Sequence, residues 1–176
     1  MKLRAALIGC GRIGTKKHIE AFAANSDLID LVAVCDLVPE KAERAAEEYM
    51  KRQEISLVRG EKERTSEKNE MQHGQDIVSS SPASECALQR PRVISDYKDL
   101  LSTNIDFVTI ATESGNHYKN TIDFLSAGKH VLVEKPMALS SEHMEQMIAL
   151  SRKKKLKLAV CVQNRFNPPV QELRKA

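Results

Sequence analysis

The sequence predicts an α/β protein of the Rossmann class, with a doubly wound, mostly parallel sheet between two layers of helices. Three observations lead to this class. Apolar runs of strand length alternate with segments of helical periodicity along most of the 176 residues. The first apolar run ends in a GxGxxG segment at residues 9–14, and the second ends in Asp36.

Length, charge and cysteine content exclude several classes of function. A chain of 176 residues has room for one well-packed domain. It has no apolar run near the ~20 residues that cross a bilayer, and its net charge of +3 gives no case for nucleic-acid binding. The four cysteines have no CxxC spacing and no paired histidines, so we expect a reduced, cytoplasmic protein without a metal site.

The first half of the chain predicts two strand–helix pairs. Strands are expected at 3–9 and 31–35, and the second is a near-continuous apolar run, as in a strand buried on both faces. One helix is expected over 13–24, and another begins at Pro39, which suits a first helical turn. The apolar positions that share inward faces are Ile19, Phe22 and Ala23 in the first helix and Ala42, Ala45, Ala46 and Tyr49 in the second.

Helical periodicity is lost after Met50, and residues 51–92 are rich in Glu, Lys, Arg, Ser and Gln. Connections in such sheets are usually short, so this stretch predicts a flexible polar insertion, with 55–58 as a candidate fragment of strand. Because it follows a helix and precedes a strand, it would leave from the N-terminal edge of the sheet, opposite the ligand crevice. We therefore expect it to have no catalytic role.

The second half continues the alternation. Strands are expected at 107–111, 131–133 and 156–162, and helices at 116–126 and after Ser140 or Ser141, with Gly128 as a helix C-cap. The basic run 152–155 fits a solvated helix C-terminus better than a phosphate site. The inward positions are Tyr118, Ile122 and Leu125 in the earlier helix and Met144, Met147, Ile148 and Ser151 in the later one.

The glycine segment has the residues that a dinucleotide pyrophosphate requires. Gly9 permits a tight turn, Gly11 lets the backbone approach the pyrophosphate, and Gly14 allows close packing of helix on strand. The helix that follows offers free N–H groups and a partial positive charge to the phosphates. A glycine turn without a ligand is the alternative, which the next site disfavours.

Asp36 lies 36 − 14 = 22 residues beyond the last glycine, close to the ~20 residues expected of the acidic residue in this fingerprint. A carboxylate there accepts hydrogen bonds from the adenosine ribose and repels a 2′-phosphate, so NAD is expected rather than NADP. Lys41 would soften that repulsion. The alternative is a solvated turn aspartate.

Glu134-Lys135-Pro136 follows another expected strand, at the edge of the sheet where ligands bind. A lysine there could hold a positive charge near a substrate hydroxyl or transfer a proton. Taken alone, these residues fit an exposed loop lysine at least as well.

Several elements in this order resemble the Gfo/Idh/MocA oxidoreductases, the family of glucose–fructose oxidoreductase and inositol dehydrogenase. They are the glycine turn followed by His18, the strand ending in Asp36, the segment 95–101 (Ser-Asp-Tyr-Lys-Asp-Leu-Leu), the strand ending in Ala111-Thr112, and Glu134-Lys135-Pro136. The resemblance covers the chain apart from the insertion. It implies oxidation or reduction of a sugar or cyclitol hydroxyl with a pyridine nucleotide.

The resemblance also implies roles for individual residues. Lys135 would be the catalytic residue, near the nicotinamide and the reacting carbon. Residues 163–168 resemble members that act on UDP-linked N-acetylamino sugars and their uronic acids. The cofactor would be bordered by Gly9, Gly11, Arg12, Ile13, Gly14, Asp36, Ala111, Thr112, Asn116, His117, Glu134, Lys135, Asn164 and Arg165.

Family members also have a second α/β domain that forms the substrate pocket. We therefore expect a nucleotide-binding domain over 1–166 and the beginning of a linker to a missing C-terminal domain over 167–176. The leading hypothesis is an NAD-dependent sugar or nucleotide-sugar dehydrogenase represented by its cofactor domain. The alternatives are a truncated, non-catalytic NAD-binding module or cofactor sensor, and an unstable fragment with an uncovered sheet face. Substrate identity and homo-oligomerisation stay open.

Overall fold

The computed structural model describes residues 2–70 and 88–175 of the chain. Six strands form one sheet in the order β3-β2-β1-β4-β5-β6, and every pair of neighbours is parallel. This is the strand order of a doubly wound dinucleotide-binding sheet, so the predicted class is confirmed. The order reverses between β1 and β4, and ligands bind such sheets at the carboxyl ends of the strands beside that point.

The elements follow one another as strands and crossover helices. The strands are β1 (Leu3–Ile8), β2 (Ile29–Cys35), β3 (Arg92–Ile94), β4 (Phe107–Ile110), β5 (His130–Glu134) and β6 (Leu158–Cys161). The α-helices are α1 (Ile19–Ala24), α2 (Pro39–Glu70), α3 (His117–Ser126), α4 (Ser141–Lys154) and α5 (Pro168–Lys175). A π-helical turn, η1 (Gly14–His18), precedes α1, and short 3-10 turns are η2 (Tyr97–Leu100), η3 (Ser114–Asn116) and η4 (Gln163–Phe166).

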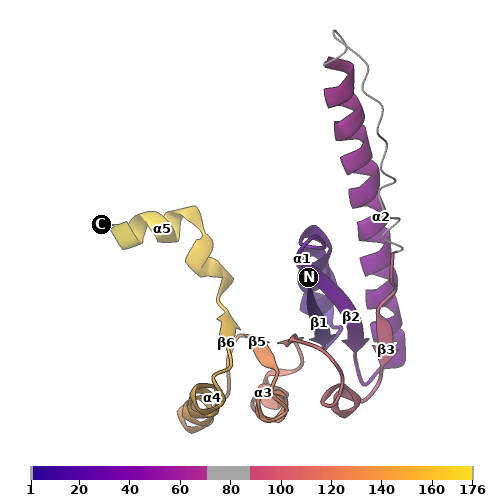
Figure 1. Ribbon diagram of the computed structural model, residues 1–176. Helices are drawn as coiled ribbons and strands as arrows, with labels where there is room; N and C mark the ends of the chain where they lie inside the picture. Colours follow the sequence, from indigo (N-terminus) through magenta and orange to yellow (C-terminus); the bar gives the residue numbers. More distant parts are fainter. Residues whose placement is uncertain (1, 71–87, 176) are drawn as a thin grey trace.

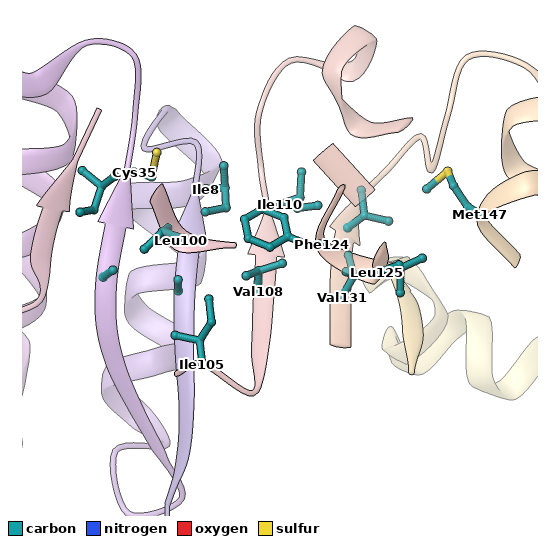
Figure 2. Close-up of a cluster of buried hydrophobic side chains, with 14 of the residues drawn as sticks. Ile8, Cys35, Leu100, Ile105, Val108, Ile110, Phe124, Leu125, Val131 and Met147 are labelled. Carbon is teal, nitrogen blue, oxygen red and sulfur yellow. The ribbon is translucent and has the colours of Figure 1, made fainter. Parts of the chain in front are cut away.

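Helices cover both faces of the sheet (Figure 1), and alternate strand residues supply two separate cores. On one face, Leu7 of β1 and Val34 of β2 pack with α1 and α2. On the other face, Ile8 and Val108 pack with Phe124 of α3 and with α4 (Figure 2). The predicted inward residues of the first two helices, Ile19, Phe22, Ala23, Ala42, Ala45, Ala46 and Tyr49, are all buried.

The predicted insertion is wrong over its first part, because α2 runs without interruption to Glu70. Residues 55–58 are accordingly helical and form no strand. Glu, Lys, Arg and Gln are strong helix formers, and the Glu48–Arg52 pair stabilises the surface of the helix at i, i+4. The end of apolar periodicity therefore marks where α2 extends beyond the sheet (Figure 1). The rest of the predicted insertion, up to residue 87, lies outside the described residues.

The second half of the chain follows its predictions closely. Ser140 caps α4 by accepting a hydrogen bond from the His143 amide at 3.2 Å, and Gly128 ends α3 with a φ of +80°. One inward position is wrong, since Ile148 is 37% exposed while Met147 and Ser151 are buried. Among the described residues, no helix combines the length and apolar character needed to cross a membrane.

Candidate cofactor-binding edge

The glycine turn after β1 is closed against the end of β4. Gly9 has a φ of +94°, and a Cβ placed there would lie 2.5 Å from the backbone of Ala111. A Cβ on Gly14 would lie 2.1 Å from the carbonyl oxygen of Gly9. Side chains at these two positions are therefore excluded by backbone atoms, which cannot move aside as a flexible side chain can.

Gly11 differs from its two neighbours in the turn. A Cβ there would have no neighbouring atom within 4 Å, so the space beside its backbone is open. Arg12 and Ile13 are exposed next to it, and the helix that begins with η1 leads away from the turn. Open space at a glycine, beside the unpaired amides of a helix start, fits the approach of a pyrophosphate.

Asp36 lies at the end of β2, and backbone amides fix its carboxylate. Oδ2 accepts a hydrogen bond from the Cys10 amide at 2.8 Å, and Oδ1 accepts one from the Val38 amide at 2.9 Å. Each oxygen keeps a second lone pair, so the carboxylate is oriented and still able to accept hydrogen bonds from a ribose. The nearby Cys10 thiol is buried, and its pKa is raised to about 12 by this burial and by the charge of Asp36.

The loop after β4 lies beside the glycine turn. Ala111 and Thr112 contribute the backbone that would clash with a side chain on Gly9, and Asn116 is exposed at the end of η3. His117 is 1% exposed, and both of its ring nitrogens face carbonyl oxygens: Nδ1 lies 2.7 Å from that of Pro136 and Nε2 lies 3.0 Å from that of Thr112. If His117 contacts the cofactor, it therefore does so through backbone atoms and not through its ring nitrogens.

Glu134 ends β5 and is bound to the helix that follows the glycine turn. Its Oε1 lies 2.8 Å from Nε2 of His18, and both side chains are nearly buried. Its Oε2 accepts the amide hydrogen of Lys135 at 3.2 Å. Cys161 of β6 pairs with Glu134 in the sheet, and burial and then the Glu134 charge raise the pKa of its thiol. The thiol therefore stays protonated as a hydrogen-bond donor near neutral pH.

His18, Glu134 and Cys161 bring a nitrogen, an oxygen and a sulfur atom within 4.8 Å of one another, the kinds of atom that bind metals. The 2.8 Å separation of His18 from Glu134 is that of a hydrogen bond. Two ligands of one tetrahedral Zn²⁺, each about 2.0–2.1 Å from the ion, lie further apart than this. The arrangement is therefore that of a hydrogen-bonded group, and the expected lack of a metal site stays a prediction.

Lys135 and Pro136 are exposed at the end of β5, where the chain turns away from the sheet through a cis peptide bond. Asn164 and Arg165 are exposed on η4, beyond the end of β6. The structure thus brings Gly9 and Asp36 into direct contact with neighbouring site segments. Among the described residues, η4 makes no hydrogen bond to the glycine turn.

Two contacts of the site were not predicted from the sequence. His18 was noted only as part of a motif, and its partner Glu134 is 116 residues away. Cys161 was expected only as part of the strand at 156–162. The local sequence pattern does not show whether a histidine is buried and paired or exposed. The available signal for His18 was its inward position on a helix next to the ligand edge.

Known proteins similar to this chain share its fold and order of elements. D-glucoside 3-dehydrogenase of Escherichia coli is 29% identical over 172 residues, which cover 98% of this chain and 38% of that protein. Inositol 2-dehydrogenase of Rhizobium meliloti is 30% identical over 176 residues, which cover 41% of it. The crystal structure of the WlbA dehydrogenase from Bordetella pertussis, in complex with NADH and UDP-GlcNAcA, superposes with a TM-score of 0.69 at 30% identity. That alignment covers all of this chain and 42% of the enzyme.

The chain thus spans about two fifths of the relatives that it matches, namely the part that contains the parallel sheet. Residues 3–162 match the model of the oxidoreductase family with an NAD-binding Rossmann fold, and this range contains the glycine turn, Asp36 and Glu134-Lys135-Pro136. The chain therefore belongs to the Gfo/Idh/MocA oxidoreductase family, as the NAD-binding Rossmann part of it.

Proposed function

We propose that this chain is the cofactor domain of a dehydrogenase that oxidises a hydroxyl of a sugar, cyclitol or nucleotide sugar. The observation that carries the proposal is that the glycine turn and Lys135 meet at one edge of the sheet, joined by the 2.8 Å hydrogen bond between His18 and Glu134. A dinucleotide bound across the switch point of the sheet extends between two such regions. The identity of the relatives as sugar and cyclitol dehydrogenases supports the class of substrate.

In this proposal the two ends of the edge bind different parts of NAD. The open backbone at Gly11, with Arg12 and Ile13, receives the pyrophosphate, and Asp36 accepts hydrogen bonds from the adenosine ribose. Ala111, Thr112, Asn116, His117, Glu134, Asn164 and Arg165 border the rest of the cofactor, with Gly9 and Gly14 closing the turn. Bound NAD supplies the acceptor for a hydride from the substrate carbon.

Lys135 is the proposed catalytic residue. Its side chain is exposed at the end of β5, and among the described residues its amine has no hydrogen-bond or ion-pair partner. A neutral amine there would accept the proton that the substrate hydroxyl releases, and the ammonium group so formed would stabilise negative charge on the substrate oxygen. Because the structure of the B. pertussis enzyme contains UDP-GlcNAcA, UDP-linked N-acetylamino sugars and their uronic acids are the first substrates to test.

Isothermal calorimetry of the chain with NAD, NADH and NADP tests the cofactor assignment. We expect NAD to bind more tightly than NADP and to bind equally well to Lys135→Ala. Turnover is then assayed with candidate sugars in a form that carries the substrate domain of its relatives, where Lys135→Ala should lose most activity. Absence of NAD binding by the wild-type chain, or near-normal turnover by Lys135→Ala, would contradict the proposal.

A non-catalytic NAD-binding module is the alternative outcome of the turnover assay. It predicts NAD binding without turnover by any form of the protein. We further propose a cytoplasmic location. Light scattering of the calorimetry samples would establish whether the chain self-associates.

A further inference from the structure

We infer that His18 and His117 are positioning residues that hold Lys135 from its two sides, and thereby couple the glycine turn to the proposed catalytic loop. This inference rests on the proposed function. Both histidines are buried, and Nε2 of His18 and both ring nitrogens of His117 lie against protein oxygens and not against open space. Both act on the residues adjacent to Lys135, one on Glu134 and the other on Pro136.

The contact of His18 acts on the N-terminal side of Lys135. His18 is the last residue of η1, the helical turn that begins at Gly14, and it is 7% exposed. Its Nε2 binds one carboxylate oxygen of Glu134, while the other oxygen accepts the amide hydrogen of Lys135. The carboxylate therefore connects the imidazole directly to the backbone of the lysine. Breaking a nearly buried pair of this kind leaves a carboxylate without its partner, which is strongly unfavourable.

The contact of His117 acts on the C-terminal side. Its Nδ1 lies 2.7 Å from the carbonyl oxygen of Pro136, and its Nε2 lies 3.0 Å from that of Thr112. A carbonyl oxygen only accepts hydrogen bonds and a neutral imidazole has one N–H, so a neutral ring donates to one of these carbonyls while its other nitrogen lies next to the second. The ring thus ties the loop after β5 to the loop after β4, the loop whose backbone packs against Gly9.

Together, the two contacts fix the backbone on both sides of a side chain that is itself free. A flexible lysine is positioned by its backbone when the residues before and after it cannot move. A merely structural pair of histidines would stabilise the fold without this selective effect on the Lys135 end of the edge. The inference therefore predicts a loss confined to ligands that reach this end.

Conservative and disruptive variants separate the two roles. Gln at position 18 places an amide nitrogen where Nε2 lies, so His18→Gln keeps the hydrogen bond to Glu134 that His18→Leu removes. Asn at position 117 can replace Nδ1, so His117→Asn keeps the contact with Pro136, whereas His117→Gln keeps the one with Thr112 instead. His130→Leu is the matched control: His130 begins the same strand, and its Nδ1 accepts a hydrogen bond from the Lys157 amide at 2.8 Å.

The measurement is the ratio of the affinities for NAD and for ADP-ribose, which lacks the nicotinamide, on each chain by calorimetry. We expect His18→Leu and His117→Gln to weaken NAD about tenfold with little change for ADP-ribose. His18→Gln and the His130→Leu control should keep the wild-type ratio, and the ratio of His117→Asn should lie closer to it than that of His117→Gln. Equal weakening of both ligands by His18→Leu, or a changed ratio in His130→Leu, would overturn the inference.

Amide hydrogen exchange at Lys135 gives a readout that needs no ligand. We expect exchange at least about tenfold faster in His18→Leu, and near the wild-type rate in His18→Gln and His130→Leu. An unchanged rate in His18→Leu would overturn the inference even if NAD binds. If the wild-type chain binds neither NAD nor ADP-ribose, the proposed function fails, and the exchange rates still decide whether the histidines hold the loop.

Discussion

The two regions of the ligand edge are built in different ways. At the glycine turn, backbone atoms determine the geometry: Gly9 and Gly14 lie against carbonyl groups, and the Asp36 carboxylate is held by two backbone amides. At the Lys135 loop, buried side chains determine it, through His18 and His117. A backbone-built site tolerates few substitutions at its glycines, whereas a side-chain-built site depends on partners far away in the sequence. The variants below test whether this distinction holds.

The largest effect is expected at the two closed glycines. Gly9→Ala meets backbone at 2.5 Å at a φ of +94°, and Gly14→Ala meets the Gly9 carbonyl oxygen at 2.1 Å. Each should lower the free energy of unfolding by about 3 kcal/mol or more, measured by urea denaturation. Gly11→Ala is the matched control, because its Cβ enters open space. It should change the free energy of unfolding by less than about 0.5 kcal/mol while weakening NAD. Similar losses from all three substitutions would show that crowding by backbone is not the cause.

At the Lys135 loop, removal of a buried side chain should lower the stability of the fold, because the geometry there depends on side chains and not on backbone atoms alone. His117→Leu introduces an apolar side chain of similar size and leaves the carbonyls of Thr112 and Pro136 without the imidazole as hydrogen-bond donor. We expect the free energy of unfolding to fall by roughly 2–3 kcal/mol, since buried carbonyls lose their hydrogen bonds. His143→Leu is the control, because His143 is half-buried and its ring stacks on Tyr118. This substitution should lower the free energy of unfolding by less. Equal effects in the urea titrations would argue that the contacts of His117 with the two carbonyls contribute little to stability.

These differences explain which features could be predicted. The roles of Gly9, Gly14 and Asp36 follow from local conformation and spacing along adjacent elements, and both are legible in the sequence. The His18–Glu134 pair joins residues 116 apart, and no periodicity or spacing encodes such a contact. The continuation of α2 was missed for another reason, because apolar periodicity reports contact with a core and α2 continues beyond it. The role of Lys135 came from the family resemblance, since an exposed loop lysine has no pattern of its own.

Asp36→Asn tests the charge at the glycine-turn end. The amide keeps an acceptor for one of the Cys10 and Val38 amides and loses the negative charge that would bind ribose hydroxyls and repel a 2′-phosphate. Charged hydrogen bonds contribute about 1.5–3 kcal/mol, so NAD should bind roughly tenfold more weakly or worse. The preference for NAD over NADP should fall with it, as calorimetry with both nucleotides would reveal. An unchanged preference would mean that another group discriminates against the 2′-phosphate.

The effect that is smallest near neutral pH concerns the buried thiols next to the glycine turn. Burial, followed by the charge of Asp36, raises the pKa of both Cys10 and Cys35 from 9.0 to about 12. In the unfolded chain these thiols ionise near pH 9, while in the folded chain they stay protonated to about pH 12. The folded state then holds more protons than the unfolded state, so stability falls as the pH rises from 9 towards 12. The slope is at most about 1.4 kcal/mol per pH unit for each thiol, and urea denaturation at several pH values measures it. Burial also raises the pKa of Tyr49 and Tyr97, so Cys35→Ala removes one of several titrating groups and should make the slope shallower. Cys161→Ala, whose thiol is only half-buried, should alter the slope less. A slope unchanged by Cys35→Ala would show that the loss of stability at alkaline pH comes from other groups and not from the buried thiols beside the glycine turn.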